Sequence, residues 1–471
     1  MNFAKMTLGV IVGNRDFFPD VLISEGRRDM LDVLAEMGID VVILDEDATK
    51  LGAVETWQHA KLCAELFRQH ADKIDGILVT LPNFGDEKGV ADTIRLAGLN
   101  VPVLVQAYPD DIDRMFIERR RDAFCGKISV CNNLYQYGIP FSLTRLHTVN
   151  PKTESFKRDL ADFLGVCRVV KHMRGARFGA IGARPNAFNT TRYSEKLMQA
   201  FGMSVSTIDL SEIFGRANKL EDKDARVNET LERIGAYVRT DKVPAPAVVK
   251  QAKLAVVIDE WMTSLDLTAS AIQCWTSLQQ NYGVSVCTIM SMMSESMMPS
   301  ACEVDVTGVA SMYALQLARL TPAALVDWNN NYGDDPDKCV LFHCGNWAKS
   351  FLGPNAFMSD QKIIGSTVGI ENTYGTLEGV TPAGPFSYAR ITTDDRNGQI
   401  KAYIGDGEFL DDPIKTFGTN AVVRVPRLQA LMQHVCRNGF EHHAAMTNAY
   451  SASVLNEAFT TYFGWETLLH A

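Results

Sequence analysis

The sequence predicts an α/β protein. It has two Rossmann- or flavodoxin-like domains with parallel sheets, followed by a β-rich C-terminal domain with an antiparallel, barrel-like arrangement. Three observations predict this fold class. The chain has 471 residues, which is longer than a single domain with one hydrophobic core usually is. Apolar runs rich in Val, Ile and Leu alternate with segments of helical periodicity over most of the chain. From about Asn355 this alternation gives way to β-type segments separated by turn residues.

The first domain is expected over residues 1–148. Its apolar runs have the continuous hydrophobicity of parallel strands that are buried on both faces. The segments between them repeat apolar residues every three or four positions, as an amphipathic helix does. The predicted strands are TLGVIVG, DVVILD, GILVTLP and VPVLVQAY, and the predicted helices are ISEGRRDMLDVLAEMG and WQHAKLCAELFRQHA.

The second domain is expected over residues 149–320 and the third over residues 321–471. The second begins with the helix PKTESFKRDLADFLGVCRVV and continues with the strands RFGAIGARP, VSTIDL, LAVVIDE and VSVCTIM. The charged stretch KLEDKDARVNETLERI is expected to be a solvated helix. The third domain contains the strands GPFSYARITTDD, QIKAYIGDGEF and NAVVRVP and the helices RLQALMQHVC and SASVLNEAFTTYF.

Charge and composition exclude several classes of partner. A net charge of -10 argues against nucleic acid or an anionic membrane surface as partner. The chain has no apolar run of the roughly 20 residues that cross a bilayer, and its N-terminus lacks the apolar core of a secretory signal. The ten cysteines contain no CxxC pair, which favours buried, reduced thiols. We therefore expect a cytoplasmic protein that binds neither nucleic acid nor membrane.

Common catalytic motifs are missing from the sequence. GARFGAIGARP lacks the G-x-G-x-x-G spacing that binds a dinucleotide pyrophosphate. The sequence also contains no phosphate-binding Walker A loop, no G-x-S-x-G nucleophile motif and no H-E-x-x-H zinc motif. These absences leave nucleotide, serine-hydrolase and zinc-protease functions without support.

Three acids lie in apolar surroundings, where an unpaired carboxylate is costly. Asp305 precedes a segment of helical periodicity, residues 306–320, so it is expected to cap that helix. Glu303 lies before the helix on a segment expected to be extended, and capping does not explain it. Asp327 ends the apolar run AALVDW, so its carboxylate is expected at the carboxyl edge of a sheet.

Histidines accompany these acids. The sequence has nine, and His343, His442 and His443 fall in the region after Asp327. On a strand, neighbouring residues point to opposite faces, so we expect at most one of the adjacent pair to face a given site. Carboxylates combined with imidazole and open water positions suit Mn²⁺, Mg²⁺ or Co²⁺ better than structural zinc. Residue types alone thus predict a divalent metal site.

Several other residues are candidate substrate contacts. Polar positions that follow strands of open α/β sheets often meet ligands. The candidates are Arg15, Asn83, Gln106, Arg184, Asn186, Trp347 and His442.

The segments CEVDVTGVASMYALQLA, PAALVDWNNNY, CVLFHCGNWAKSF and GFEHHAAM resemble the L-fucose isomerase and L-arabinose isomerase superfamily. The resemblance implies that Glu303 and Asp327 are metal ligands and also the acid/base pair, with His443 as the late metal-binding histidine. Asp327 matches the fucose branch, whereas His343 resembles an additional ligand of the arabinose branch. Which carboxylate is the base, and whether His343 is a ligand, stay open.

The activity implied by the resemblance is reversible aldose–ketose isomerisation of an open-chain sugar through a cis-enediol, with a 1,2-hydride shift as the rival mechanism. The expected cofactor is a divalent metal, foremost Mn²⁺, with Co²⁺ or Mg²⁺ as alternatives. The expected assembly is a homo-oligomer, a hexamer or tetramer, with sites near subunit interfaces. The substrate stays open among L-fucose, L- or D-arabinose and modified hexoses such as sulfonated ones.

Two functions of other classes also remain. A pair of α/β domains can bind a sugar without catalysis. A nicotinamide-dependent dehydrogenase is the less favoured alternative, because its glycine fingerprint is missing.

Overall fold

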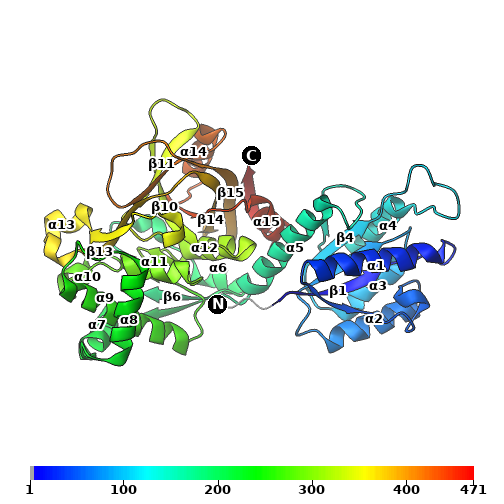
Figure 1. Cartoon of the computed structure of the whole chain (residues 1–471), viewed down its shortest axis with the longest axis horizontal. Coiled ribbons are helices and arrows are strands. Elements are labelled where there is room, and N and C mark those ends of the chain that lie inside the picture. Colours follow the sequence, from blue (N-terminus) through cyan, green and yellow to red (C-terminus); the bar gives the residue numbers. More distant parts are fainter. Residues whose placement is uncertain (1–4) are drawn as a thin grey trace. The chain divides into compact units, whose positions relative to one another are not determined.

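The computed structural model describes residues 5–471, which form two compact units (Figure 1). The N-terminal unit contains the described residues up to Lys171 together with Glu457–Gly464. The C-terminal unit contains His172–Asn456 and Trp465–Ala471. The domain boundaries expected after residues 148 and 320 stay predictions.

The N-terminal unit is built on a five-stranded parallel sheet with the order β2-β1-β3-β4-β5. Its strands are β1 (Thr7–Val12), β2 (Asp40–Ile43), β3 (Gly76–Leu81), β4 (Val103–Ala107) and β5 (Ser142–Leu143). Its helices are α1 (Asp20–Glu36), α2 (Trp57–Gln69), α3 (Glu87–Ala97), α4 (Ala123–Gln136) and α5 (Glu154–Met173), with the short helices η1 (Lys50–Gly52) and η5 (Glu457–Tyr462).

Both faces of this sheet are covered. Leu78 and Val79 are neighbours in β3 and belong to separate hydrophobic cores, because alternate side chains of a strand point to opposite faces. One core contains Phe67 from α2, and the other contains Phe156 from α5. The predicted flavodoxin-like domain is thereby confirmed.

The C-terminal unit begins with a second parallel sheet, of four strands in the order β7-β6-β8-β9. Its strands are β6 (Arg177–Ile181), β7 (Ser204–Ile208), β8 (Ala269–Ile272) and β9 (Ser300–Cys302). Its helices are η2 (Asn189–Thr191), α6 (Glu195–Ala200), α7 (Leu210–Lys219), α8 (Ala225–Tyr237), α9 (Ala245–Ser264), α10 (Ser277–Asn281), α11 (Cys287–Glu295) and α12 (Val306–Arg319).

Two strands predicted for this sheet are wrong. LAVVIDE, residues 254–260, lies inside α9, and VSVCTIM, residues 284–290, runs from a loop into α11. The reason lies in how α9 is buried: Val256 packs in one core, whereas Val257 and Ile258 pack in another. A helix that is apolar all round loses its periodicity and resembles a buried strand in sequence.

A nine-stranded, mostly antiparallel sheet completes the C-terminal unit. Its strands are β10 (Ala323–Asn331), β11 (Lys338–His343), β12 (Phe357–Asp360), β13 (Tyr374–Val380), β14 (Gly384–Asp394), β15 (Gln399–Leu410), β16 (Thr419–Arg424), β17 (His443–Thr447) and β18 (Glu466–His470). Its helices are η3 (Lys349–Phe351), α13 (Lys362–Val368), η4 (Ile370–Asn372), α14 (Leu428–Arg437) and α15 (Ala452–Asn456).

Part of this sheet closes into a barrel. The strands run in the order β16-β11-β10-β17-β14-β15, and β15 pairs again with β16. All pairs in this ring are antiparallel, so the predicted barrel-like domain is confirmed. The buried helix α12 contacts β8 of the parallel sheet and β10, β14 and β17 of the barrel.

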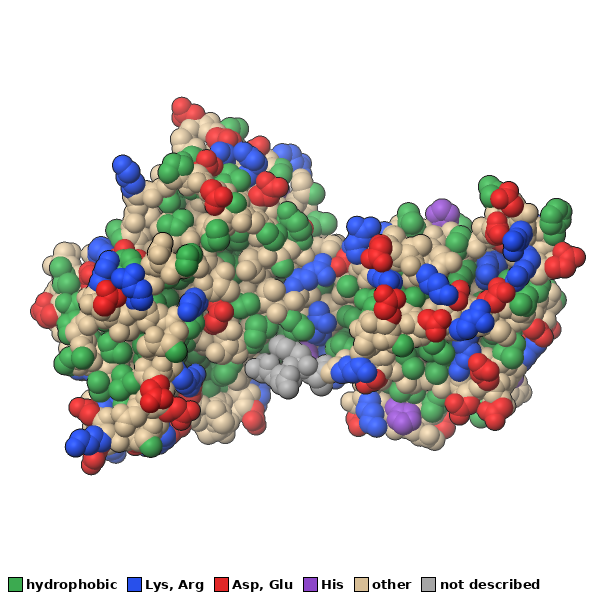
Figure 2. Space-filling model, viewed as in Figure 1, with side chains coloured by type: hydrophobic (Ala, Val, Ile, Leu, Met, Phe, Trp, Pro, Cys, Tyr) green, Lys and Arg blue, Asp and Glu red, His purple; other side chains and the backbone are tan. Residues whose placement is uncertain are grey.

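The surface and the cysteines complete the description. On the face shown in Figure 2, acidic and basic side chains are interspersed on both units without a continuous basic surface. Among the described residues, we find no helix with the length and apolarity that a membrane crossing requires. All ten cysteines are free, but Cys125 and Cys436, expected to be buried, are exposed.

Candidate active site

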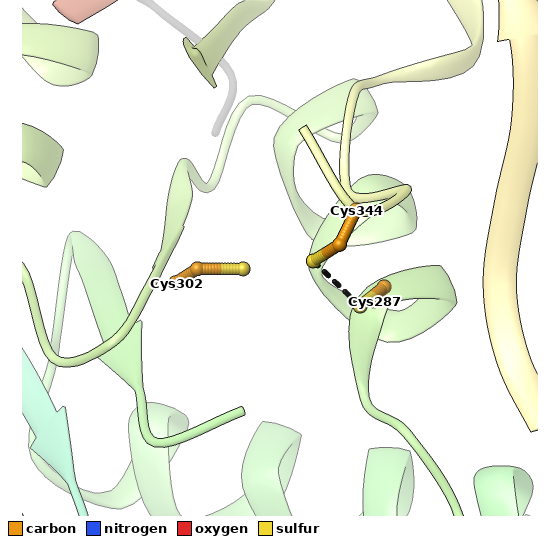
Figure 3. Close-up of side chains that lie close together, drawn as sticks. All are labelled: Cys287, Cys302 and Cys344. Carbon is orange, nitrogen blue, oxygen red and sulfur yellow. Dashed lines mark hydrogen bonds between the residues drawn. The ribbon is translucent and has the colours of Figure 1, made fainter. Parts of the chain in front are cut away.

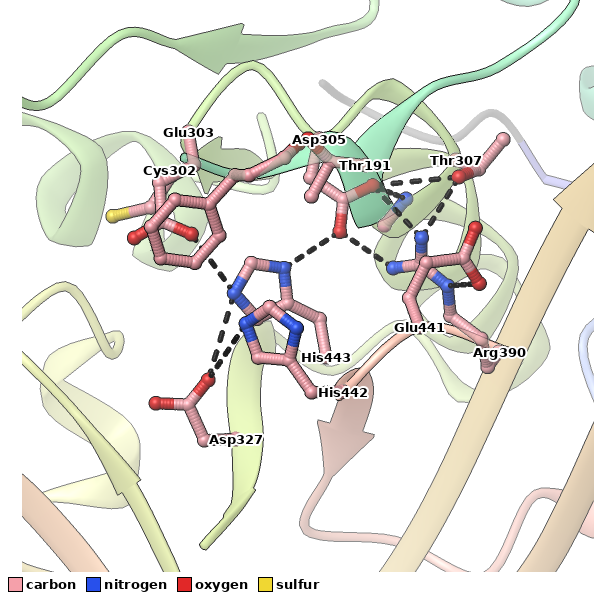
Figure 4. Close-up of polar contacts among 12 residues, drawn as sticks. Thr191, Cys302, Glu303, Asp305, Thr307, Asp327, Arg390, Glu441, His442 and His443 are labelled. Atoms are coloured by element: carbon pink, nitrogen blue, oxygen red, sulfur yellow. Dashed lines mark hydrogen bonds and ion pairs between the residues drawn. The ribbon is translucent and has the colours of Figure 1, made fainter. Parts of the chain in front are cut away.

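His443 is the centre of a buried polar cluster in the C-terminal unit (Figure 4). It begins β17 and pairs with Asp327 of β10, so the barrel register brings these two residues together. Its Nε2 atom lies 3.0 Å from Oε2 of Glu303 and 3.5 Å from Oδ1 of Asp327. The residues predicted as the core of a metal site therefore converge on one ring nitrogen.

Glu303 reaches this point from the parallel sheet. It follows β9 and precedes α12, and both Glu303 and Val304 have left-handed backbone angles, with φ of 62° and 55°. The expectation of an extended segment is wrong here, because the chain must turn sharply between the end of β9 and the start of α12. Left-handed backbone at residues with side chains is uncommon and is found often at functional sites.

His442 also approaches Asp327, with its Nε2 atom 3.7 Å from Oδ1. The expectation that at most one of the adjacent histidines faces the site is wrong. The alternation of strand side chains does not apply, because β17 begins only at His443. His442 differs from His443 in exposure: its side chain is 39% exposed, whereas that of His443 is 1% exposed.

The contact made by the second ring nitrogen, Nδ1, determines the tautomer of His443. Nδ1 lies 2.8 Å from Oδ2 of Asp305, and a carboxylate can only accept, so Nδ1 carries the proton in the neutral ring. The Nε2 lone pair is then directed at Glu303 and Asp327. This carboxylate–histidine arrangement is the one that orients metal-binding histidines in proteins.

A metal ion fits this arrangement. Oε2 of Glu303 and Nε2 of His443 are buried, and neither has a hydrogen-bond partner among the described residues. Two ligand atoms at cis positions of an ion with bonds of about 2.1 Å lie about 3.0 Å apart, which is close to the separations measured around His443. The oxygen and imidazole donors suit Mn²⁺, Co²⁺ or Mg²⁺.

His343 has a different tautomer. It ends β11 with its Nε2 atom buried, within reach of Glu303 and His443. Its Nδ1 accepts the backbone N–H of Cys344 at 2.9 Å, so the proton of the neutral ring lies on Nε2. An N–H cannot bind a metal, and this contact favours His343 as a hydrogen-bond donor to a bound substrate rather than as a ligand.

Asp305 has two functions in this site. Its side chain accepts the backbone N–H of Gly308 at 2.8 Å, which confirms the predicted helix cap. It also forms a buried ion pair with Arg390, at 2.6 Å and 2.9 Å. Arg390 in turn contacts Glu441 at 3.0 Å. These three charged side chains are buried and form a network next to His443 (Figure 4).

These charges shift the pKa values of the cluster. Burial alone would lower the pKa of His443, but the neighbouring carboxylates of Asp305 and Glu303 raise it to about 10. Burial would raise the pKa of Glu303, but His443 holds it below its ordinary value. Burial likewise opposes the charge on Asp305, yet Arg390 and His443 hold the pKa of that carboxyl well below its usual range.

Two aromatic residues that the sequence did not single out also line the cluster. Nε1 of Trp275 donates to Oε1 of Glu303 at 3.2 Å and thereby fixes the carboxylate. The ring of Phe188 lies 5.1 Å from that of Trp275 and 5.4 Å from that of His442, measured between centroids. Phe188 belongs to the loop after β6, so this loop covers the cluster.

Arg184 and Asn186 belong to the same loop as Phe188. Arg184 is partly buried and donates to the carbonyl of Pro185, whereas Asn186 is exposed. Trp347 is fully buried, and its Nε1 donates to the carbonyl of Leu325 at 2.9 Å, which gives it a packing role in this structure. Contact of these residues with substrate stays a prediction.

The remaining substrate candidates belong to the N-terminal unit. Arg15 and Asn83 follow β1 and β3, and the side chain of Asn83 accepts the backbone N–H of Arg15 at 3.3 Å. Gln106 lies within β4, where it is fully buried and bonds to Thr80 and to the carbonyl of Val149. A substrate role for these residues also stays a prediction.

Two family models match separate parts of the chain. A family model described as "Fucose/sulfoquinovose isomerase, N-terminal domain" matches residues 9–174. A second, described as "L-fucose isomerase, C-terminal domain", matches residues 341–470, which include His343, His442 and His443.

Curated relatives are named sulfoquinovose isomerase. The protein from Alkalicoccus urumqiensis is 26% identical over 306 residues, which are 64% of this chain and 66% of that relative. The protein from Priestia aryabhattai is 25% identical over 287 residues, 60% of this chain and 62% of the relative. The protein from Clostridium sp. (strain MSTE9) is 25% identical over 307 residues, 62% of this chain and 64% of the relative. The match thus spans slightly less than two thirds of these relatives.

The two family models together match more than half of the chain. The chain belongs to the fucose isomerase-like family that these two models describe.

Proposed function

We propose that this protein is a metal-dependent aldose–ketose isomerase and that Glu303, Asp327 and His443 hold its divalent ion. One observation carries the proposal. Two buried atoms without hydrogen-bond partners among the described residues, Oε2 of Glu303 and Nε2 of His443, converge at 3.0 Å beside the carboxylate of Asp327. A buried polar atom without a partner costs free energy, so such a pair is explained best by a missing ligand. Mn²⁺ is the first candidate.

The bound ion would supply Lewis-acid polarisation of the sugar carbonyl. The carboxylates of Glu303 and Asp327 then move the protons of a cis-enediol pathway. One takes the proton from C2 and returns it to C1, and the other exchanges the hydroxyl protons; such positioned groups each contribute about 10²–10⁴-fold. Trp275 holds Glu303 in place, and Nε2–H of His343 is available to a substrate oxygen.

The two carboxylates differ in exposure, and the same kind of substitution tests each of them. Glu303 is 8% exposed at its side chain, whereas Asp327 is 26% exposed. Glu303→Gln and Asp327→Asn keep the size of each side chain and remove its basicity. Turnover is expected to fall by at least about 100-fold in each, as for removal of a general base. Asp334→Asn, which changes an exposed acid in the turn between β10 and β11, is the matched control.

Metal dependence is tested with protein stripped by a chelator. We expect no isomerisation without metal and recovery with Mn²⁺, and with Co²⁺ or Mg²⁺ to other extents. Turnover that persists in the stripped protein, or in Glu303→Gln with its metal still bound, would refute the proposal. Reaction in D₂O separates the mechanisms, because enediol chemistry incorporates solvent deuterium and a 1,2-hydride shift does not.

The substrate class that the named relatives suggest is a sulfonated hexose, and sulfoquinovose is therefore the first sugar to assay. L-fucose and L- and D-arabinose complete the panel, since all of them present the same C1–C2 chemistry. Saturable binding of a sugar without conversion, in the presence of Mn²⁺, would favour the non-catalytic sugar-binding alternative. A homo-oligomer with sites near subunit interfaces remains part of the proposal, and its size is measured by light scattering.

A further inference from the structure

Three cysteine side chains from separate parts of the C-terminal unit point toward a common space (Figure 3). Cys287 begins α11, Cys302 ends β9 and Cys344 follows β11. Their Sγ atoms all lie within 4.8 Å of one another, and those of Cys287 and Cys344 are 3.9 Å apart. The three thiols are free, and we call them the sulfur cluster.

The spacing of the sulfur cluster matches a metal–thiolate site. Zinc–thiolate bonds measure about 2.3 Å, so three sulfurs around one ion in a plane lie about 4.0 Å apart. The 3.9 Å separation of Cys287 and Cys344 agrees with this value, and Cys302 needs only a small side-chain movement to complete the triangle. Sulfurs in a disulfide would be about 2.05 Å apart.

Polar groups next to the sulfurs point to a ligand as well. Nδ2 of Asn346 donates to Sγ of Cys302 at 3.3 Å, and Asn346 is 2% exposed. Its Oδ1 atom has no hydrogen-bond partner among the described residues. A buried amide that donates to a thiol is unusual in an apolar core, whereas N–H groups commonly stabilise metal-bound sulfur. The thioether of Met290 lies 4.0 Å from Cys302 and adds a further soft atom.

The sulfur cluster and the candidate active site are made by consecutive residues. Cys302 is followed by Glu303, and His343 is followed by Cys344. Each of these two pairs therefore supplies one residue to the sulfur cluster and one to the candidate active site. One site offers oxygen and imidazole atoms, and the other offers sulfur alone. Such ligand sets select different ions, because thiolates prefer soft metals and carboxylates prefer hard ones.

We propose that Cys287, Cys302 and Cys344 bind one thiophilic divalent ion of the zinc and cadmium type, separate from the ion of the carboxylate–histidine site. The thiols bind as thiolates and release their protons to solvent. This site does not depend on the proposed isomerase function, since it rests on other side chains. Occupancy would fix Cys344, whose backbone N–H donates to Nδ1 of His343, and would thereby hold the His343 ring.

The test uses the full chain, kept reduced with a thiol-free phosphine, stripped with a chelator and then saturated with Mn²⁺. Cadmium is titrated in, and the ultraviolet absorption of cadmium–thiolate bonds is recorded. We expect saturation at one cadmium per chain, with most of the absorption lost in Cys287→Ala and Cys344→Ala. Cys339→Ala is the matched control, because Cys339 is buried in β11 but lies outside the sulfur cluster.

X-ray absorption at the cadmium edge of the wild-type protein provides a second readout that needs no variant. Sulfur neighbours alone, or with one oxygen, support the proposal. Three results would overturn it: no thiolate absorption in reduced protein, equal absorption in wild type and both cluster variants, or a shell of oxygen and nitrogen only. A Cys287–Cys344 disulfide that survives the reductant would also contradict it.

Discussion

Replacement of Asp305 by Asn tests whether the buried charge network orients the metal-binding histidine. The substitution keeps the size of the side chain and an oxygen for the helix cap, but it removes the negative charge. Asp305 contacts Arg390 at 2.6 Å and His443 at 2.8 Å, and the side chains of Asp305 and Arg390 are wholly buried. Arg390 would retain Glu441 at 3.0 Å as its remaining carboxylate.

The expected magnitudes follow from these contacts. Loss of one partner of a buried ion pair costs about 3–5 kcal/mol, and retention of Glu441 places Asp305→Asn at the lower end of that range. The loss of the oriented Nδ1–H contact of His443 is expected to weaken metal binding by about 10–100-fold, as for other outer-shell partners of metal ligands. The loss of stability and the loss of metal affinity should therefore appear in the same variant.

The assay combines a Mn²⁺ titration, with free Mn²⁺ measured by electron paramagnetic resonance, and thermal unfolding of the metal-free protein. Asp86→Asn is the control, because Asp86 caps α3 through Gly89 at 2.6 Å in the same manner as Asp305 caps α12 through Gly308. It should leave both quantities unchanged. Wild-type Mn²⁺ affinity in a folded Asp305→Asn protein would refute the positioning role.

Three further predictions concern other parts of the chain. Gly308→Ala should also weaken Mn²⁺ binding, because a Cβ at this position would lie 2.5 Å from Oδ2 of Asp305 and must displace it; unchanged binding would show that the carboxylate can move freely. Phe188→Ala should raise KM more than it lowers kcat, since it opens the loop that covers the histidines, and a change in kcat alone would count against this. Lys127 should make the N-terminal unit more stable at alkaline pH. Burial lowers its pKa from 10.5 to about 8, so between these values the unfolded chain binds the extra proton and stability rises with pH. The full gain in the free energy of unfolding is about 3 kcal/mol. The free energy of unfolding of Lys127→Met, measured with urea, should not show this rise between pH 8 and 10.5.

The fold was predictable where hydrophobic patterns are distinct. Continuous Val/Ile/Leu runs identified β1, β3 and β4, and alternating segments after residue 355 identified β14 and β15. The pattern failed at α9, because residues 254–258 of that helix are all buried and pack in two separate cores, so no polar residue marks the helical period there. Strand β9 was missed because it has only three residues.

The candidate site was predictable in its residue types but not in its geometry. Glu303 and Asp327 were identifiable as acids without an obvious partner, and Asp305 as a cap. The proximity of His442 to Asp327 and the tautomer of His343 depend on where strands end, which periodicity cannot locate to one residue. One feature of the sequence could have identified Arg390: it is the charged residue within the predicted strand segment SYARITT.

The sulfur cluster was outside the reach of sequence reasoning. Metal sites are recognised by short spacings such as CxxC. Cys287, Cys302 and Cys344 are far apart along the chain, and only the packing of α11, β9 and β11 brings their sulfurs together. Each cysteine by itself is indistinguishable from a buried apolar residue.

The central claim is that Glu303, Asp327 and His443 hold one divalent ion. Anomalous X-ray scattering at the manganese edge, from crystals of stripped protein soaked in Mn²⁺, tests it most directly. The account predicts one strong peak bonded to Nε2 of His443 and to an oxygen of each carboxylate, with Nδ1 of His443 still on Asp305. A peak elsewhere, or no peak at saturating Mn²⁺, would contradict it.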